Sequence, residues 1–343
     1  MDGEDPPGKQ ALARRGTTTP VVDAPVATLG SLLCPSRDRT PRERAGGVSA
    51  PPRIDRTRPA LLRALSRLAE PDPDPELCEL LGLPPPPPAD VCTQVFVLES
   101  HPFASVHLGP QGMLGGEASD RVAGFWRTLR LDPPPDADRL SRLLDLYAGL
   151  GAEELQSAGH RRHAVGSARA ALFWEHLASW VPSYLGCVTH IGGAFYRSWA
   201  TLLVEALAGE ACTVPQRAQL PSALSRAAPP CDAGTRQALL DGLLAPVCSG
   251  MVVTRAELVQ AGSELGLGVR LGERRYTLGA LLDQDGPATL RWLASLATQW
   301  ERRHQELHPD ALAGVGEWWA GRARHTAGVL AAASAGATVM TPA

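Results

Sequence analysis

Apolar residues recur at intervals of three and four through most of the chain after residue 57, a spacing typical of amphipathic α-helices. The clearest stripes are Val122, Phe125, Trp126 and Leu129, and then Leu140, Leu143, Leu144 and Tyr147. No segment shows the sustained alternation of apolar and polar residues expected of a half-buried strand. The pattern therefore predicts an all-α fold, a helical bundle with an additional helical C-terminal extension.

Proline runs mark where several of these helices end, because proline lacks a backbone N–H and clashes with the preceding helical turn. The runs are Pro71–Pro75, Pro84–Pro88 and Pro133–Pro135. Later in the chain, Thr254 and Glu257 have the spacing of a capping box, and Gly266 suits the left-handed end of the same helix. Gly286–Pro287 is expected to break the helix that begins near Leu278.

One segment, Val91–Leu98, is ambiguous. Val91, Val95 and Val97 favour a strand, but a single strand without a partner is improbable in a helical chain. We therefore expect a helix there.

The chain divides into several parts. Residues 1–57 carry many prolines and charges without an apolar period, so we expect them to be disordered. Residues 58–211 hold the first helical set, 212–231 a linker with several prolines, 232–333 the helical C-terminal extension, and 334–343 a frayed tail.

Composition narrows the functional classes. The formal net charge of -3 and the isoelectric point near 6.3 give no reason to expect nucleic acid as a partner of the whole chain. Seven dispersed cysteines without a CxxC pair indicate a reduced, cytoplasmic protein. No secretory signal is visible, and two uncharged stretches, Leu177–Tyr196 and Thr326–Ala343, are too polar or too weakly apolar to span a membrane.

The sequence contains few motifs of known catalytic chemistry. The glycines of Gly109–Gly116 lack the GK[ST] ending of a phosphate loop, and no GxSxG sequence occurs. His304 and His308, with Glu306 between them, could bind a metal, but a polar helix end is the simpler interpretation. We therefore expect no enzymatic activity, no metal and no cofactor.

The stretch His101–Leu150 is the most distinctive. Its loop, His101–Gly116, contains four glycines and two prolines, and we expect an ordered loop on the surface. Asp136 and Asp138 then precede a helix, where carboxylates favour the positive end of the helix dipole.

These motifs resemble those of the TorD-like chaperones, the redox enzyme maturation proteins of the TorD, DmsD and NarJ group. The loop matches at Pro102, Phe103, Ser105 and Val106, and the helix start matches at Asp136, Asp138 and Leu140. A second match is Leu172–Tyr184, which contains Glu175, His176 and Trp180 and is followed by Phe195–Leu203. Two positions depart from the family pattern: His107 stands where an aromatic residue is usual, and Arg139 where a histidine is usual.

The resemblance covers about residues 58–207, and the part from Leu244 onward looks like an extension of longer family members. It implies a cytoplasmic, non-catalytic, all-helical chaperone, either a monomer or a domain-swapped dimer. Its partners would be the twin-arginine signal peptide and the immature catalytic subunit of a molybdopterin oxidoreductase, held until cofactor insertion. The residues implied in client binding are Pro102, Phe103, Ser105, Val106, Asp136, Asp138, Arg139, Glu175, His176 and Trp180.

Charge is compatible with this expectation. Residues 90–216 contain nine basic and thirteen acidic residues, a net of -4, which is the sign that favours a pair of arginines. An apolar helical groove could bind the hydrophobic part of a signal peptide.

The alternative is a DNA-binding regulator that uses residues 254–282 as a helix-turn-helix. Arg270, Arg274 and Arg275 lie between its two expected helices, but the chain from Arg217 onward has a net charge of only about +1. DNA binding usually depends on a denser basic face.

Overall fold

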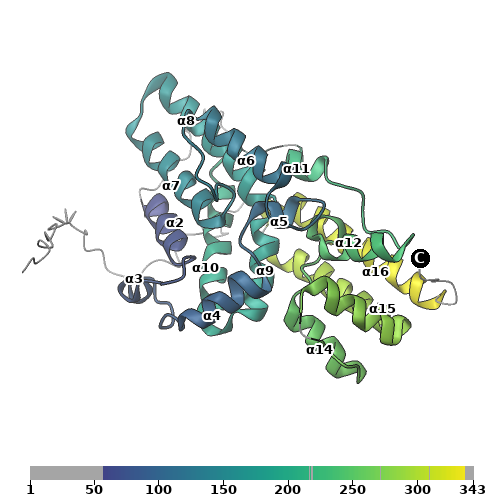
Figure 1. Ribbon diagram of the computed structural model, residues 1–343. Coiled ribbons are helices and arrows are strands. Elements are labelled where there is room, and N and C mark those ends of the chain that lie inside the picture. Colours follow the sequence, from purple (N-terminus) through teal and green to yellow (C-terminus); the bar gives the residue numbers. More distant parts are fainter. Residues whose placement is uncertain (1–56, 216, 218, 271, 309, 337–343) are drawn as a thin grey trace, which may run out of the picture.

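The computed structural model describes residues 57–336 apart from 216, 218, 271 and 309, and this part of the chain is all-α, as the apolar spacing predicts (Figure 1). The first elements are α2 (Thr57–Arg67), α3 (Pro75–Leu80), α4 (Ala89–Thr93), the π-helix η1 (Gln94–Glu99), α5 (Ala104–Leu108), α6 (Gly116–Thr128), α7 (Leu140–Gln156), α8 (Gly159–Leu172), the π-helix η2 (Phe173–Ala178), α9 (Val181–Ile191) and α10 (Gly193–Ala211).

The remaining elements are α11 (Ser222–Ser225), α12 (Arg236–Leu244), α13 (Pro246–Ser249), α14 (Arg255–Leu265), α15 (Arg274–Leu307), the 3-10 turn η3 (Asp310–Leu312) and α16 (Ala313–Ala335). Among the described residues no strand occurs, and extended pairing is confined to a single bridge between Phe103 and Arg139. The disorder expected for residues 1–56 and most of the expected C-terminal tail lie outside the described residues, and α16 continues to Ala335.

Local signals set several helix ends as expected. The Thr254–Glu257 capping box forms in full, and Gly266 ends α14 in the left-handed conformation with φ of 67°. The ambiguous segment is helical, as predicted, with α4 continuing into η1. The break expected at Gly286–Pro287 is also present: Asp285 leaves the helical conformation, and its carboxylate accepts a bond from the N–H of Ala288, so α15 consists of two helical segments joined at a kink.

The loop His101–Gly116 differs from the prediction, because much of it is buried and contains α5. Pro102 and residues 104–109 are buried. Gly112 has a φ of +62°, and a Cβ there would collide with the carbonyl oxygen of Leu244. Proline and glycine correctly signalled turns, but here the small residues allow the C-terminal extension to pack closely on the loop.

The two parts of the chain share a core. The cluster around Trp180, Tyr184 and Trp199 also contains side chains of the extension: Ala245, Val247, Cys248, Leu312, Val315 and Trp319. The indole N–H of Trp319 donates to the carbonyl of Ser179 at 3.0 Å. A second cluster, centred on Leu293 and Trp300, joins α12, α14, α15 and α16. The extension is therefore built against the first helical set, with α15 and α16 lying along each other.

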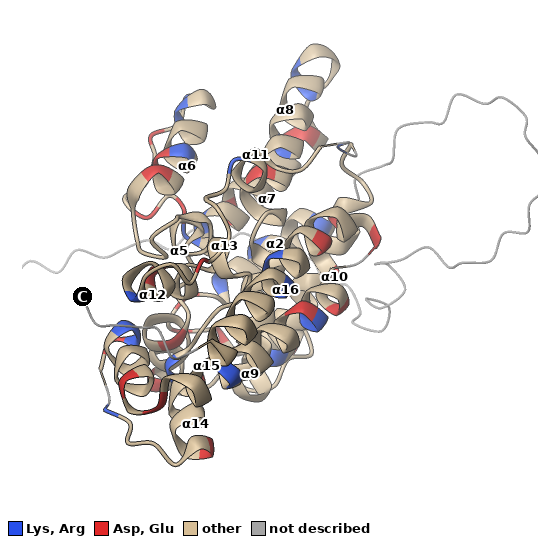
Figure 2. Cartoon of the chain, turned by 90° about the vertical axis from the view of Figure 1, so that its right-hand side faces the viewer, with Lys and Arg blue, Asp and Glu red and all other residues tan. Residues whose placement is uncertain are grey.

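The helices α6 and α8 project at one end of the molecule (Figure 2). A buried polar group fixes α8: Arg169 donates to Glu154 on α7 at 2.7 Å and to Glu210 on α10 at 2.7 Å. The hydroxyl of Tyr147 also donates to Glu210, at 2.6 Å. None of the helices in the described part combines the length and apolar character needed to cross a membrane.

Candidate binding site

Asp138 does not cap the helix that follows it. The N-cap of α7 is Arg139, which makes no side-chain capping bond. Instead, Asp138 Oδ2 accepts from the backbone N–H of Ser105 at 2.9 Å, at the start of α5, and Oδ1 accepts from the hydroxyl of Ser119 at 3.1 Å. Both Asp138 and Ser105 are buried, so this carboxylate holds α5 and α6 together inside the protein.

Backbone bonds reinforce this junction. The N–H of Ala104 donates to the carbonyl of Asp138 at 3.0 Å, and the N–H of Leu140 donates to the carbonyl of Pro102 at 2.8 Å. Phe103 is half-buried opposite Arg139. The structure thus brings together the two motifs that lie more than thirty residues apart in the sequence.

Asp136 and Arg139 form a partly exposed ion-pair group beside this junction. Asp136 lies 3.3 Å from Arg142 and 3.9 Å from Arg139, and Arg139 also pairs with Glu70 at 3.0 Å. A client arginine would therefore have to exchange with side chains already bound to Asp136.

Val106 and Trp180 belong to the interior. The ring of Trp180 stacks on that of His107 with centroids 5.1 Å apart, and its N–H donates to the carbonyl of His176 at 2.8 Å. His107, one of the departures from the family pattern, thus packs as an aromatic ring would. Burial lowers the pKa of His107 to about 3, so its ring is neutral at pH 7.

Glu175 and His176 line a surface hollow of about 340 Å³, which we call the Phe125 hollow. Its other lining residues are Leu108, Arg121, Phe125, Ser222 and Ala223. The rings of His176 and Phe125 have centroids 5.1 Å apart, and burial lowers the pKa of His176 to about 4. His176 is therefore neutral at pH 7, and the charged side chains that line the hollow are those of Arg121 and Glu175.

Glu175 itself turns toward the chain that follows α10. Its carboxylate accepts from the backbone N–H of Ser222 at 2.7 Å and forms an ion pair with Arg217. These contacts place residues 219–222 between the Phe125 hollow and a second, larger one.

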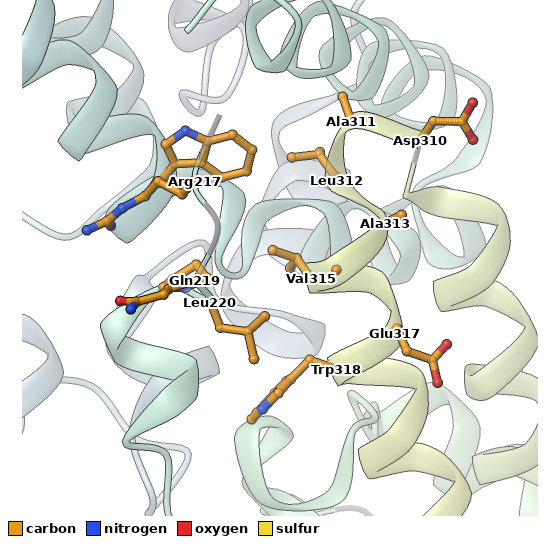
Figure 3. A pocket seen from close by; sticks show the side chains of 13 residues that line it. Arg217, Gln219, Leu220, Asp310, Ala311, Leu312, Ala313, Val315, Glu317 and Trp318 are labelled. Carbon is orange, nitrogen blue, oxygen red and sulfur yellow. The ribbon is translucent and has the colours of Figure 1, made fainter. Parts of the chain in front are cut away.

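The second hollow, which we call the Trp318 hollow, has a volume of about 510 Å³ (Figure 3). Leu220, Leu312 and Val315 point toward its centre, with Trp318 at one end. Asp310 and Glu317 lie along the α16 side, and Arg217 lies on the opposite side. The result is an apolar depression in the size range of ligand pockets. The carboxylates of Asp310 and Glu317 turn away from its centre, and Glu317 pairs with Arg324 at 3.5 Å.

Sequence reasoning missed the Trp318 hollow entirely. Its walls come from the presumed linker and from the start of α16, about ninety residues apart along the chain. Leu220 was the one local signal, since it is a large apolar residue beside Pro221 that stays 37% exposed. The presumed linker also contributes to the interior, because Val214, Ala223 and Leu224 are buried.

The two histidines of the candidate metal site have hydrogen-bond partners within the protein. His304 donates to the carbonyl of Gly250 and His308 to that of His304, both at 2.7 Å, while Glu306 faces solvent. The part of the chain that the structure covers contains no group of three or more His, Cys, Asp or Glu side chains placed to hold a metal.

The arginines of the helix-turn-helix interpretation are similarly engaged. Arg274 donates to the carbonyl of Val253 at 2.9 Å, and Arg275 pairs with Asp241 at 2.5 Å. Arg270 donates to the hydroxyl of Tyr276 at 3.2 Å.

Comparisons with known proteins add no relative. The chain matches no protein-family model, no curated protein and no solved structure.

Proposed function

We propose that this protein is a cytoplasmic, non-catalytic chaperone of the TorD-like type. Its clients would be the twin-arginine signal peptide and the immature catalytic subunit of a molybdopterin oxidoreductase, which it holds until the cofactor is inserted. The ordered motifs of the sequence support the family, and the observation that carries the binding role is the Trp318 hollow with its apolar centre.

The hollow suits the two chemical features of such a peptide. Leu220, Leu312 and Val315 offer apolar surface to a hydrophobic segment, in the manner of a helix bound in a groove. Asp310 and Glu317 add negative charge at the outer, α16 edge of the hollow, which favours flanking arginines; an arginine bound to Glu317 would replace its present partner, Arg324. The binding energy would come mainly from the apolar contacts, because exposed ion pairs contribute little.

The residues that the family resemblance implies in client binding differ in their exposure to solvent. Asp138, Ser105, Val106 and Trp180 are buried, and so is Pro102, so these residues stabilise the fold and do not line the Trp318 hollow. Glu175 holds the chain that forms one wall of the hollow. The direct client contacts expected for the partly exposed Phe103, Asp136, Arg139 and His176 stay predictions. Of these residues, the ion-paired Asp136 is the most direct to test by substitution.

Affinity capture tests the function. The tagged full chain and its Leu220→Asp variant are expressed in cells that produce a molybdopterin oxidoreductase. We expect the wild-type chain to recover the cofactor-free catalytic subunit and the variant to recover much less, because a carboxylate in the hollow repels an apolar segment. Equal recovery by both, or recovery of no such subunit, would contradict the proposal.

The DNA-binding alternative has weaker support, because Arg270, Arg274 and Arg275 are bound to Tyr276, Val253 and Asp241. It predicts strongly salt-dependent binding to duplex DNA. A mobility shift of duplex DNA at low salt that disappears at high salt would favour it over the chaperone.

A further inference from the structure

A small polar pocket lies between α14 and α15, two helices that pack against each other (Figure 1). Its volume is about 160 Å³, and we call it the Arg303 pocket. Polar side chains form most of its two long walls: Glu257, Gln260 and Glu264 on α14, and Ser295, Gln299 and Arg303 on α15. Among the described residues, none lines both this pocket and the Trp318 hollow, so a ligand bound here is independent of the chaperone proposal.

Glu257 places a buried carboxylate in the α14 wall. Its Oε2 atom accepts from the backbone N–H and from the hydroxyl of Thr254, at 2.9 Å and 3.0 Å. The Oε1 atom lies 3.8 Å from Nη1 of Arg303, which is too long for a hydrogen bond. Burial raises the pKa of Glu257, because a buried carboxylate is unfavourable without a close positive charge. A cationic donor at Oε1 would offset this cost.

Arg303 supplies the opposite charge and an unused donor. Its guanidinium lies over the ring of the fully buried Trp300, with 5.0 Å between Cζ and the ring centroid, and this contact fixes its position. In the part of the chain that the structure describes, Nη1 of Arg303 is buried and has no hydrogen-bond partner. A buried charged donor without an acceptor is unfavourable. A carboxylate is the acceptor that a guanidinium binds best, through two parallel N–H bonds.

The other ionisable groups of the pocket offer no comparable charge. Glu264 already accepts two hydrogen bonds, from the amide of Gln260 at 2.7 Å and from the indole N–H of Trp292 at 2.6 Å. His190, at the end of α9, also lines the pocket. Burial and the charge of Arg303 lower the pKa of His190, so its ring is mainly neutral at pH 7. The groups left to bind a ligand are therefore one carboxylate oxygen and one guanidinium.

This pair of opposite charges selects the class of ligand. A simple anion would lie beside the carboxylate of Glu257, and a simple cation would lie beside Arg303, so each would be repelled by one of the two groups. A molecule that carries an ammonium and a carboxylate group on the same carbon atom is attracted by both. We propose that the Arg303 pocket binds a free α-amino acid, with its ammonium group on Glu257 and its carboxylate on Arg303.

The rest of the pocket indicates the side chain of this amino acid. Gln260, Ser295 and Gln299 present amide and hydroxyl groups along the walls. An apolar side chain would leave these groups without partners, whereas a polar, uncharged one would bond them. Glu264 lies seven residues beyond Glu257 on α14, about 10 Å at the helical rise of 1.5 Å per residue. That length suits an amino acid with an extended amide side chain, and L-glutamine is the best match.

Isothermal titration calorimetry of the full chain with L-glutamine tests the site. We expect saturable binding. N-acetyl-L-glutamine lacks the ammonium charge and L-glutaminamide lacks the carboxylate, so each should bind at least tenfold more weakly than L-glutamine. Equal affinity for these blocked compounds would overturn the charge assignment. L-leucine, which has an apolar side chain, should also bind more weakly, and an affinity equal to that of L-glutamine would overturn the assigned side-chain preference.

Two pairs of variants locate the binding. Arg303→Met should weaken L-glutamine binding at least tenfold, whereas Arg302→Met, at the exposed neighbouring position outside the pocket, should leave it unchanged. Ser295→Trp fills the pocket from an exposed position and should abolish binding, which decides the matter if Arg303→Met does not fold. Gln305→Trp, exposed on α15 outside the pocket, is its control. No saturable binding to the wild type, or binding that survives Ser295→Trp, would overturn the inference.

Discussion

Asp138 accepts a hydrogen bond from the backbone N–H of Ser105 at 2.9 Å, and both residues are buried. This contact links the two motifs that most strongly suggested a chaperone. It gives Asp138 an internal partner at the start of α5 and leaves Asp136, two residues earlier, as the accessible acid of the pair.

Asp138→Ala should therefore lower the free energy of unfolding by about 2–3 kcal/mol, because the buried N–H of Ser105 loses a charged acceptor and Ser119 loses its partner. Urea unfolding followed by circular dichroism measures the change. Asp136→Ala is the matched control, since it removes only partly exposed ion pairs and should cost less than about 1 kcal/mol. Equal losses in the two variants would show that Asp138 has no special structural role.

Arg169→Met should be more damaging. Arg169 is buried between Glu154 and Glu210, and its removal leaves at least one carboxylate without a compensating charge, at a cost of about 3–5 kcal/mol. Thermal unfolding should show a large decrease in Tm.

Arg161→Met is the matched control for the loss of Arg169 from its network with Glu154 and Glu210. Arg161 pairs with Glu153 at 2.6 Å on the exposed end of α8, so its loss should change stability by less than about 0.5 kcal/mol. A small effect at Arg169 as well would mean that the buried network contributes little to the position of α8.

Acid should destabilise the protein through its buried histidines. Burial lowers the pKa of His107 and His304 to about 3 and that of His308 to about 4, against an ordinary value of 6.5. At a pH between the folded and the unfolded pKa, the unfolded chain binds more protons than the folded one. The contribution of the neutral histidines to the free energy of unfolding is therefore fully present above pH 6.5 and is lost as the pH falls. Each of these histidines should lower the free energy of unfolding by about 2 kcal/mol as the pH falls from 6.5 to 5.

His107→Phe tests one of these contributions. Phenylalanine keeps an aromatic ring against Trp180 but cannot be protonated, so the stability lost between pH 7 and pH 5 should be about 2 kcal/mol smaller than in the wild type. Urea unfolding at the two pH values measures this difference. The exposed His163→Gln should behave as the wild type does, and an unchanged pH dependence in His107→Phe would contradict the assignment.

Sequence reasoning was sufficient where structure depends on neighbouring residues. Apolar spacing predicted the all-α class, Thr254 and Glu257 formed their capping box, and Gly266 ended its helix as expected. These features depend on contacts within about one helical turn. Thr and Glu side chains form the hydrogen bonds of the capping box, and glycine can adopt the left-handed conformation that ends the helix.

Contacts between distant segments could not be predicted in the same way. Asp138 looked like a cap for α7 because acids are common before helices, yet its partner lies thirty-three residues earlier. Trp319 donates to the carbonyl of Ser179 and joins the extension to the first helical set, although the two residues lie 140 positions apart. The Trp318 hollow exists only because η3 and α16 pack beside the chain that follows α10, and no local pattern indicates that packing.

The central claim is that the Trp318 hollow binds an apolar client segment flanked by arginines. Its most direct test is a fluorescence anisotropy titration of a labelled peptide, with two adjacent arginines followed by leucines and alanines, against the wild type, Leu220→Asp and Leu80→Asp. Both leucines are exposed, but only Leu220 lines the hollow. We predict saturable binding that Leu220→Asp weakens about tenfold or more, as expected for the loss of one buried leucine contact, and that Leu80→Asp leaves unchanged. The same affinity for all three proteins, or no saturable binding to any of them, would contradict the account.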